Sequence, residues 1–267
     1  MRPSTVVRIV VAIAAAWALA GVAMVARGDP EGRRTLVGLI LMGMLVGGLA
    51  WAVFRFRIEP RRGSFDAQAR RAGFHPQAGD PLGLMGMPFG LFRRAASVRD
   101  LENTARGVRG RREIVVADYW YAPSSNPSLD DYRRFVCVID PDRQEWPDLV
   151  VTPMGPIAAA RDAMGLARVD MESERFNRAF EVRTNDRRFA AAFLDARMMD
   201  WLMQQAPGMG VEIADGRLMV FEPRSIASVD DVGRALRRFD EVLQHVSSVV
   251  RSWYPAPEPS AAARPDR

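Results

Sequence analysis

The sequence contains no lysine, because all 37 of its basic residues are arginine. This absence excludes a Walker-type phosphate loop, a Schiff-base lysine and the ATP-positioning lysine of protein kinases, since each needs a lysine ammonium group. Histidine and cysteine are almost as rare, with His75, His245 and Cys137 as their whole complement. These three residues cannot build a standard structural zinc site. No G-x-S-x-G motif surrounds any serine, so the α/β-hydrolase signature is also missing.

Cys137 lies inside the apolar run 135–139. An apolar environment disfavours the thiolate, which is the reactive form of cysteine. We therefore interpret Cys137 as a packing residue of the core and not as a nucleophile. One cysteine also excludes an intramolecular disulfide, which suits a reducing compartment.

Two long apolar runs, residues 6–26 and 35–54, occupy the N-terminal part of the chain. Apart from Arg8 they carry no ionisable side chain, and each is long enough for a helix to cross a hydrocarbon core of about 30 Å. We therefore predict two transmembrane helices joined as a hairpin. In the second run, Gly43 and Gly47 have the small-xxx-small spacing of helices that pack in lipid, which makes this run a candidate contact with a membrane-protein partner.

The arginines around the two runs predict the orientation of this hairpin, which takes up residues 1–62. The loop between the runs contains three arginines, and the flanks contain six, namely Arg2, Arg8, Arg55, Arg57, Arg61 and Arg62. Because arginine is enriched in cytoplasmic loops, we expect a multi-pass protein of the bacterial inner membrane. Both its N-terminus and its C-terminus are then cytoplasmic.

The first run can also be interpreted as a secretory signal peptide. It has a basic start, an apolar stretch and the small-x-small pattern Ala18-Leu19-Ala20 of a signal-peptidase site. Cleavage there would leave one span and could place the rest of the chain outside the cell. The apolar run continues to Ala26, past this site, which favours the interpretation with two spans.

Positive charge is concentrated next to the predicted spans. Up to Arg112 the chain has 18 arginines and 7 acidic residues, and beyond it 19 arginines and 25 acidic residues. Anionic lipid head groups attract such clusters by about 1 kcal/mol per residue near the surface. We predict anionic membrane lipid as a partner, and no nucleic acid, because no aromatic ladder or binding motif accompanies the arginines. The predicted membrane-surface contacts are Arg55, Arg57, Arg61, Arg62, Arg70 and Arg71.

Residues 63–112 are expected to form a basic juxtamembrane segment. A short amphipathic helix is predicted to start at Ser64 and to end at Gly73. The stretch Gly79–Gly90 is rich in helix breakers but unusually apolar. It lacks the preceding strand and the downstream acid of a dinucleotide-binding loop. We expect it to pack on the membrane surface or under the domain that follows.

Residues 113–254 are predicted to form one soluble α+β domain with an antiparallel sheet packed by helices, followed by a disordered tail at 255–267. The dipeptide Asp215-Gly216 suits a two-residue type I′ turn and predicts a β-hairpin. The residues 119–121, Tyr-Trp-Tyr, could line a ligand groove, although core packing is the commoner role of such residues. The predicted strands are 114–121, 132–139, 149–152 and the two arms of the hairpin 211–221.

Three helices are expected within this domain. Residues 155–165 have helical spacing and end at a glycine. Asn185 or Asp186 can cap the next helix, and Asp195 can start the one after it.

The last and longest helix is predicted from Ser228 to Trp253. Its apolar stripe is broad enough to lie on its own domain, although its heptad spacing also makes it a candidate homo-oligomer contact. His245 falls off this stripe and is expected in solvent.

Asp170, Glu172 and Glu174 alternate with less polar residues. On an extended chain the three carboxylates would project from one face, as an oxygen-ligand magnesium or calcium site requires. They are the candidate metal ligands of the chain. No further acidic residue follows at a recognised spacing, so a solvated face is the simpler interpretation.

Several short stretches in the second half of the chain carry a resemblance to known families. They are the run Glu172–Val182, then Asp186, Phe189-Ala190, Leu194-Asp195, Met199 and the Asp215-Gly216 turn. With these residues, the segment 65–221 resembles families of uncharacterised bacterial membrane proteins with two N-terminal transmembrane helices and a cytoplasmic domain of unknown function. The resemblance implies the same layout and brings no activity, cofactor or catalytic residue.

These observations favour a membrane-anchored cytoplasmic binding or scaffold module, and a non-enzymatic role over an enzyme. We expect no cofactor, because no complete set of catalytic or cofactor-binding groups stands out. Two alternatives stay open. One is a metal-assisted hydrolase that uses Asp170, Glu172 and Glu174, and the other is an accessory subunit of a membrane complex.

Overall fold

The computed structural model describes residues 43, 48, 59–93, 96–123, 132–154, 165–224 and 230–255, with side chains from Ser64 onward in the folded part. The chain divides into two compact units, residues 1–64 and 65–267. Within the described ranges, no helix has both the length and the apolar composition that a membrane crossing needs. The two predicted spans lie outside these ranges, except for Gly43 and Gly48, which are helical.

Other predictions also fall outside the described residues. They concern the signal-peptidase site, the helix 155–165 before its closing glycine, the cap at Ser228 and the tail beyond Pro255. These stay predictions.

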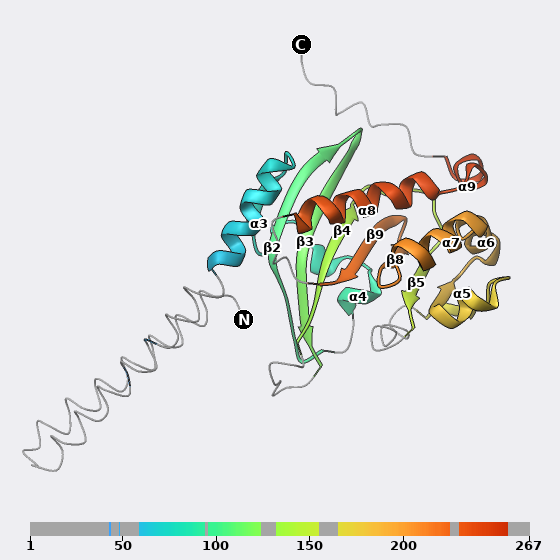
Figure 1. Cartoon of the computed structure of the whole chain (residues 1–267), viewed down its shortest axis with the longest axis horizontal. Helices are drawn as coiled ribbons and strands as arrows, with labels where there is room; N and C mark the ends of the chain where they lie inside the picture. Colours follow the sequence, from blue (N-terminus) through green and yellow to red (C-terminus); the bar gives the residue numbers. More distant parts are fainter. Residues whose placement is uncertain are drawn as a thin grey trace, which may run out of the picture. The chain divides into compact units, whose positions relative to one another are not determined.

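A nine-stranded antiparallel sheet forms the centre of the second unit (Figure 1). Its strand order is β1-β2-β3-β4-β9-β8-β5-β7-β6. The predicted α+β domain with an antiparallel sheet is therefore confirmed. The strands are β1 (His75–Ala78), β2 (Val98–Arg109), β3 (Arg112–Ala122), β4 (Arg133–Asp140), β5 (Leu149–Pro153), β6 (Ala167–Val169), β7 (Phe180–Thr184), β8 (Gly210–Ala214) and β9 (Arg217–Pro223).

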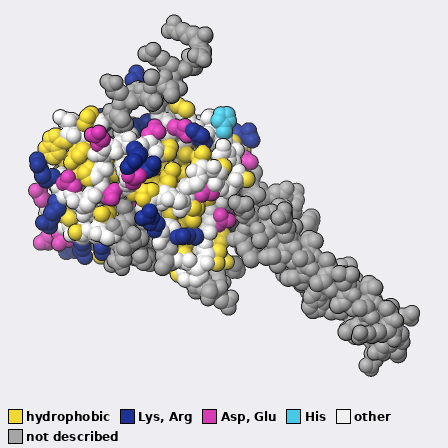
Figure 2. Space-filling view, turned by 180° about the vertical axis from the view of Figure 1, so that it is seen from behind, with side chains coloured by type: hydrophobic (Ala, Val, Ile, Leu, Met, Phe, Trp, Pro, Cys, Tyr) yellow, Lys and Arg dark blue, Asp and Glu magenta, His cyan; other side chains and the backbone are white. Residues whose placement is uncertain are grey.

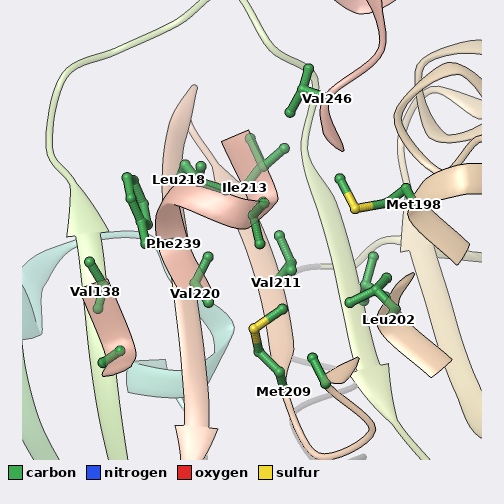
Figure 3. Packing of buried hydrophobic residues seen from close by; sticks show 14 of the residues in the cluster. Val138, Met198, Leu202, Met209, Val211, Ile213, Leu218, Val220, Phe239 and Val246 are labelled. Carbon is green, nitrogen blue, oxygen red and sulfur yellow. The ribbon is translucent and has the colours of Figure 1, made fainter. Parts of the chain in front are cut away.

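One side of the sheet, which we call the helical face, is covered by α-helices. Figure 1 shows α8 lying across the strands on this side. In Figure 3, Phe239 of α8 lies near Val138 of β4 and Val220 of β9, and all three are buried. The helices that contribute residues of the second unit to this core are α3 (Glu59–Arg71, through Phe65 and Ala69), α5 (Glu174–Ala179), α6 (Arg187–Phe193), α7 (Ala196–Gln205), α8 (Asp231–His245) and α9 (Ser248–Trp253).

On the opposite side, the described segment 79–93, which we call the strap, covers the part of the sheet formed by β2, β3, β4, β9 and the end of β8. It contains the 3-10 turn η2 (Leu84–Gly86) and the one-turn helix α4 (Gly90–Arg93). Its buried side chains pack on residues of β2, β3, β4, β8 and β9. The expectation that this stretch packs under the domain is confirmed. The buried strap residues are Leu84, Phe89, Leu91 and Phe92.

The strap is fixed to the sheet by polar contacts as well as by apolar packing. The buried carboxylate of Glu212 in β8 accepts hydrogen bonds from the backbone N–H groups of Gly90 and Leu91. The Tyr119 hydroxyl donates to the carbonyl oxygen of Leu91 (3.2 Å). Within the strap itself, the Asp80 carboxylate accepts from the first N–H groups of η2. Together these bonds satisfy backbone groups of the strap that have no backbone partner.

The predicted strands between residues 114 and 152 are confirmed by β3, β4 and β5. The predicted hairpin is also confirmed, with Ile213 opposite Leu218 in β8 and β9. Its turn has positive φ angles at Asp215 (51°) and Gly216 (72°), as a type I′ turn requires. A side chain at Gly216 would also overlap the carbonyl oxygen of Gln144, so glycine is required there for a second reason.

Strands β1 and β2 lie in residues that we assigned to a juxtamembrane segment. They extend the sheet, and β2 pairs with β3 along its whole length around a turn at Gly110. The boundary that we predicted after residue 112 therefore falls inside a β-hairpin. Strand β2 escaped prediction because it is polar, lacks alternation and contains a register shift at Leu101 and Asn103.

The helix caps were predicted correctly in the middle of the domain. Asp186 caps α6, and Asp195 caps α7 through the N–H of Met198 (2.9 Å). The first helix differs, because α3 begins at Glu59 and Ser64 is therefore not its cap. Its predicted end is close, since Gly73 has a φ of 81° two residues after Arg71.

The predicted helix from Ser228 to Trp253 is two helices, α8 and α9. Ser247 is extended between them, and its hydroxyl caps α9 through the N–H of Val250 (3.2 Å). The same hydroxyl donates to the carbonyl oxygen of Ala192 (2.7 Å). A serine side chain that bonds to backbone groups competes with the helix, which explains the break.

Candidate functional site

A hollow of about 310 Å³ lies between the start of α6 and the end of α9. Asp186, Arg188, Trp253 and Tyr254 line it, and we call it the α6–α9 hollow. It combines a carboxylate, a guanidinium, an indole and a phenol from two distant parts of the sequence. Aromatic surface with a few placed polar groups is typical of ligand sites.

Asp186 holds the wall of this hollow in place. One of its carboxylate oxygens accepts hydrogen bonds from the backbone N–H groups of Arg188 (2.8 Å) and Phe189 (3.0 Å). The other accepts from the Tyr254 hydroxyl (3.3 Å). The Tyr254 ring also meets the buried Phe189 ring edge-on, with centroids 5.2 Å apart. The end of the last helix is thereby tied to the start of α6.

The Tyr254 hydroxyl remains a donor at neutral pH. Partial burial is the main cause that raises the pKa of Tyr254, and the negative charge of Asp186 and the hydrogen bond to it act in the same direction. A phenol with a raised pKa stays protonated, so its bond to Asp186 persists.

Trp253 and Arg188 form the outer part of the hollow. The Arg188 guanidinium lies 5.1 Å from the centroid of the Trp253 ring, within the range of a cation–π contact. Trp253 is nevertheless 49% exposed, and Val249, one turn earlier on α9, is 43% exposed. No carboxylate of the described residues forms a salt bridge with Arg188. This cation is therefore held on an aromatic ring and has no acidic partner there.

A second hollow, of about 280 Å³, lies between the strap and the β2–β3 hairpin. Its charged groups include Arg106 and Glu113, which pair with each other. Its lining is mixed, with apolar strap residues beside this ion pair and the acidic Asp142. Figure 2, which views the molecule from behind, shows arginine and acidic side chains interspersed among hydrophobic ones. The hollow is lined by Leu82, Leu84, Met87, Arg106, Glu113, Val115, Pro141 and Asp142.

The candidate metal ligands Asp170, Glu172 and Glu174 do not share one extended strand. Strand β6 ends at Val169, and Glu174 is the first residue of α5, so the chain bends between the three acids. All three are exposed. Asp170 and Glu174 each lie near an arginine, 3.4 Å from Arg168 and 3.6 Å from Arg178 respectively. In the described ranges, no three histidine, cysteine or acidic residues are grouped so that they could hold a metal ion.

The predicted membrane-surface arginines are described only in part. Arg70 and Arg71 are exposed at the end of α3. Arg61 and Arg62 belong to the same helix, but their side chains lie outside the described residues, as do Arg55 and Arg57 entirely. Lipid contact by these residues stays a prediction.

Two other residues singled out in the sequence, Cys137 and His245, pack against neighbouring side chains. Cys137 is fully buried under the strap, as predicted. Burial, followed by the charges of Asp118 and Glu212, raises the pKa of its thiol well above the usual value. His245 was predicted in solvent, which is wrong, because its ring stacks on Trp201 with centroids 4.9 Å apart.

The sequence pattern indicated separate residues of the α6–α9 hollow but did not predict that they come together. Asp186 was identified as a helix cap, and Trp253 was placed on the apolar stripe of one long helix. The break at Ser247 changes the direction of the chain, so Val250 is buried while Val249 and Trp253 are exposed. The available signal was the pair Trp253-Tyr254 directly before Pro255, which indicates aromatic side chains at the end of a helix.

Comparison with known proteins yields little similarity. No family model matches the chain, and no curated protein matches it. Among solved structures, the crystal structure of the mycobacterial trehalose monomycolate transport factor A, TtfA, aligns with 70% of this chain and 96% of its own. The TM-score is 0.42 and the sequence identity is 12%. At this level of similarity we transfer neither structure nor function from it.

Proposed function

We propose that the protein is a membrane-anchored binding module that holds a partner or ligand at the α6–α9 hollow. Two apolar runs without ionisable groups over most of their length support the anchor, and the arginine distribution supports cytoplasmic termini. The chemistry of the hollow supports binding.

The observation that carries the proposal is the half-exposed Trp253 with Arg188 beside it. Large aromatic side chains and arginine dominate the binding energy of known interfaces, since they bring area and directed hydrogen bonds together. The described residues that line the hollow include no acid–base pair poised for proton transfer. Asp186 already accepts three hydrogen bonds, and Tyr254 is held protonated. These groups suit recognition better than proton transfer.

Membrane attachment is tested by ultracentrifugation without detergent and by a carboxy-terminal alkaline phosphatase fusion, which is active only in the periplasm. We expect the chain in the pellet and an inactive reporter. Protein in the supernatant would remove the anchor, and an active reporter would reverse the orientation. Mature protein that has lost its first twenty residues would favour the signal-peptide interpretation.

Binding is tested with the full chain in a mild detergent extract. We expect Trp253→Ala to lose a partner that the wild-type chain captures, because the substitution removes the main contact surface of the hollow. Glu172→Ala is the matched control, since Glu172 is exposed and does not line the hollow. Equal capture by both variants would place the partner elsewhere on the chain.

A further inference from the structure

We propose that the α6–α9 hollow binds an anionic group, a phosphate or a carboxylate, through Arg188, while an adjoining apolar or aromatic part of the ligand lies on Trp253. The proposal rests on the binding function above and specifies its ligand class.

The first argument is the state of Arg188. Some surface arginines of the domain are neutralised by nearby acids, as in the pairs Arg178–Glu174 (3.6 Å) and Arg237–Asp230 (2.6 Å), whereas Arg188 contacts an aromatic ring. Asp186 lies only two residues from Arg188, yet its carboxylate bonds to backbone N–H groups and to Tyr254 instead. The guanidinium is a planar fork of donors that matches a phosphate or carboxylate in two bonds. Its donors therefore lack the acidic partner that they suit best.

The second argument is the surface beside it. Trp253 is half exposed although it is the largest kind of apolar side chain, and Val249 extends the same helix face. Contact with a ring or an alkyl chain would remove this surface from water, which is favourable in proportion to the area buried. An anion bound to Arg188 would thus have an apolar support within one side-chain length. A purely ionic ligand would leave that support unused.

The third argument is that the hollow is already formed. Tyr254 is fixed by its bond to Asp186 and by its edge-on contact with Phe189. Arg188 is held against Trp253. A ligand would therefore meet side chains that have lost much of their freedom, which lowers the entropy cost of binding. The volume of about 310 Å³ accommodates a head group or a small aromatic anion but not a large cofactor.

The charge balance also favours an anion. Among the described residues, Asp186 is the one acid that lines the hollow, and three hydrogen-bond donors surround its carboxylate. Arg187 precedes Arg188 and is exposed as well. The charges of Asp186 and Arg188 in the lining cancel each other, and Arg187 adds one positive charge beside the hollow.

The experiment uses the purified full chain in a non-ionic detergent. One arm titrates phenyl phosphate, a soluble aromatic anion, by calorimetry. The other arm titrates phosphatidic acid in mixed micelles, with phosphatidylcholine as the neutral comparison. Saturable binding in the first arm identifies a soluble ligand, and binding only in the second identifies a lipid head group. Either result supports the proposal, and no saturable binding in both arms overturns it.

Matched variants locate the binding. Arg188→Gln is expected to weaken binding about ten-fold or more, and Trp253→Ala to weaken phenyl phosphate similarly. Arg175→Gln is the control, because Arg175 is an exposed arginine of α5 that does not line the hollow. Equal affinity of Arg188→Gln and the wild type overturns the assignment. Arg188→Lys, which keeps the charge and loses the fork, provides the same test if Arg188→Gln does not fold.

The result is separable from the anchor. A chain that pellets with membranes but binds neither anion loses this inference alone. A chain that binds phenyl phosphate but stays in the supernatant loses the anchor and keeps the ligand class.

Discussion

The two faces of the sheet are covered by different means. On the helical face, helices from both ends of the second unit, from α3 to α9, place a continuous apolar layer over the strands. On the strap face, 15 residues do the same over the β2–β9 part of the sheet, and four of their side chains are fully buried. The helical face uses amphipathic periodicity, whereas the strap uses a few anchor residues and hydrogen bonds to defined acceptors.

Because they are held in different ways, the helices and the strap should detach from the sheet in different ways. A helix on the helical face satisfies its own backbone, so apolar area dominates what holds it. The strap forms only turn hydrogen bonds of its own, and its Gly90 and Leu91 depend on Glu212 and Tyr119 of the sheet for theirs. We therefore expect the strap to open as a separate unit, while the loss of a helix contact weakens the whole domain.

The largest effect is expected at Phe239, which is buried on the helical face. Phe239→Ala removes a ring that lies over β4 and β9, and we expect a loss of about 3–5 kcal/mol in the free energy of unfolding. Chemical denaturation in mild detergent measures it. Val249→Ala, on the exposed side of α9, should change stability by less than about 0.5 kcal/mol. A similar small loss at both positions would contradict the packing described for this face.

A smaller and more local effect is expected at Glu212. Glu212→Ala leaves the buried N–H groups of Gly90 and Leu91 without an acceptor, which lowers the free energy of unfolding by about 1–3 kcal/mol. Hydrogen exchange should rise in residues 79–93 first, while β8 and β9 stay protected. Glu172→Ala, an exposed acid, serves as the control. Uniform loss of protection would mean that the strap does not open separately.

The pH dependence of the free energy of unfolding should show whether water is excluded from the core under the strap. The pKa of the Cys137 thiol is raised in the folded state, so folding favours the protonated thiol. The unfolded thiol ionises near pH 8.5, and above that pH the unfolded state binds fewer protons and gains free energy of ionisation. The protonated thiol therefore contributes its full stabilisation of the folded state below about pH 8.5. This stabilisation falls by about 1.4 kcal/mol by pH 9.5. In a plot of the free energy of unfolding against pH, the wild type should therefore fall more steeply above pH 8.5 than Cys137→Ala. Equal slopes for the two proteins would show that water reaches the thiol.

The smallest effect is expected at an ion pair that links the β2–β3 hairpin to α8 on the helical face. Arg109 donates two hydrogen bonds to Asp240, at 2.9 and 2.7 Å, and both side chains are about one-third exposed. Surface pairs of this kind contribute about 0.2–1 kcal/mol. A double-mutant cycle with Arg109→Gln and Asp240→Asn measures the coupling. A coupling of several kcal/mol would mean that the helical face depends on this pair more than on packing.

Features determined by neighbouring residues could be predicted from the sequence. The Asp215-Gly216 turn and the caps at Asp186 and Asp195 each need only a few consecutive residues. Strand β2 and the role of the strap could not be predicted in the same way. The acceptor for Gly90 is Glu212, 122 residues away, and nothing near Gly90 indicates that such an acceptor exists.

The candidate site shows the same limit. Asp186 was predicted as a cap, but its second partner, Tyr254, lies 68 residues further along the chain. Trp253 was placed on a buried stripe because the pattern of one long helix continues through Ser247. The hydrogen bond from Ser247 to Ala192 breaks that helix, and this long-range contact decides which aromatic ring is exposed.

The order of the strands has a consequence for synthesis on the ribosome. β4 and β9 are adjacent in the sheet, yet β4 ends at Asp140 and β9 begins at Arg217. At about 5–20 residues per second, roughly 4–15 s pass between their emergence. During that interval the free edge of β4, with Val136, Val138 and Ile139, has no strand to pair with, and such an edge readily pairs with another chain. The nascent protein therefore depends on prompt capture of this edge, by a chaperone or by the second half of its own sheet.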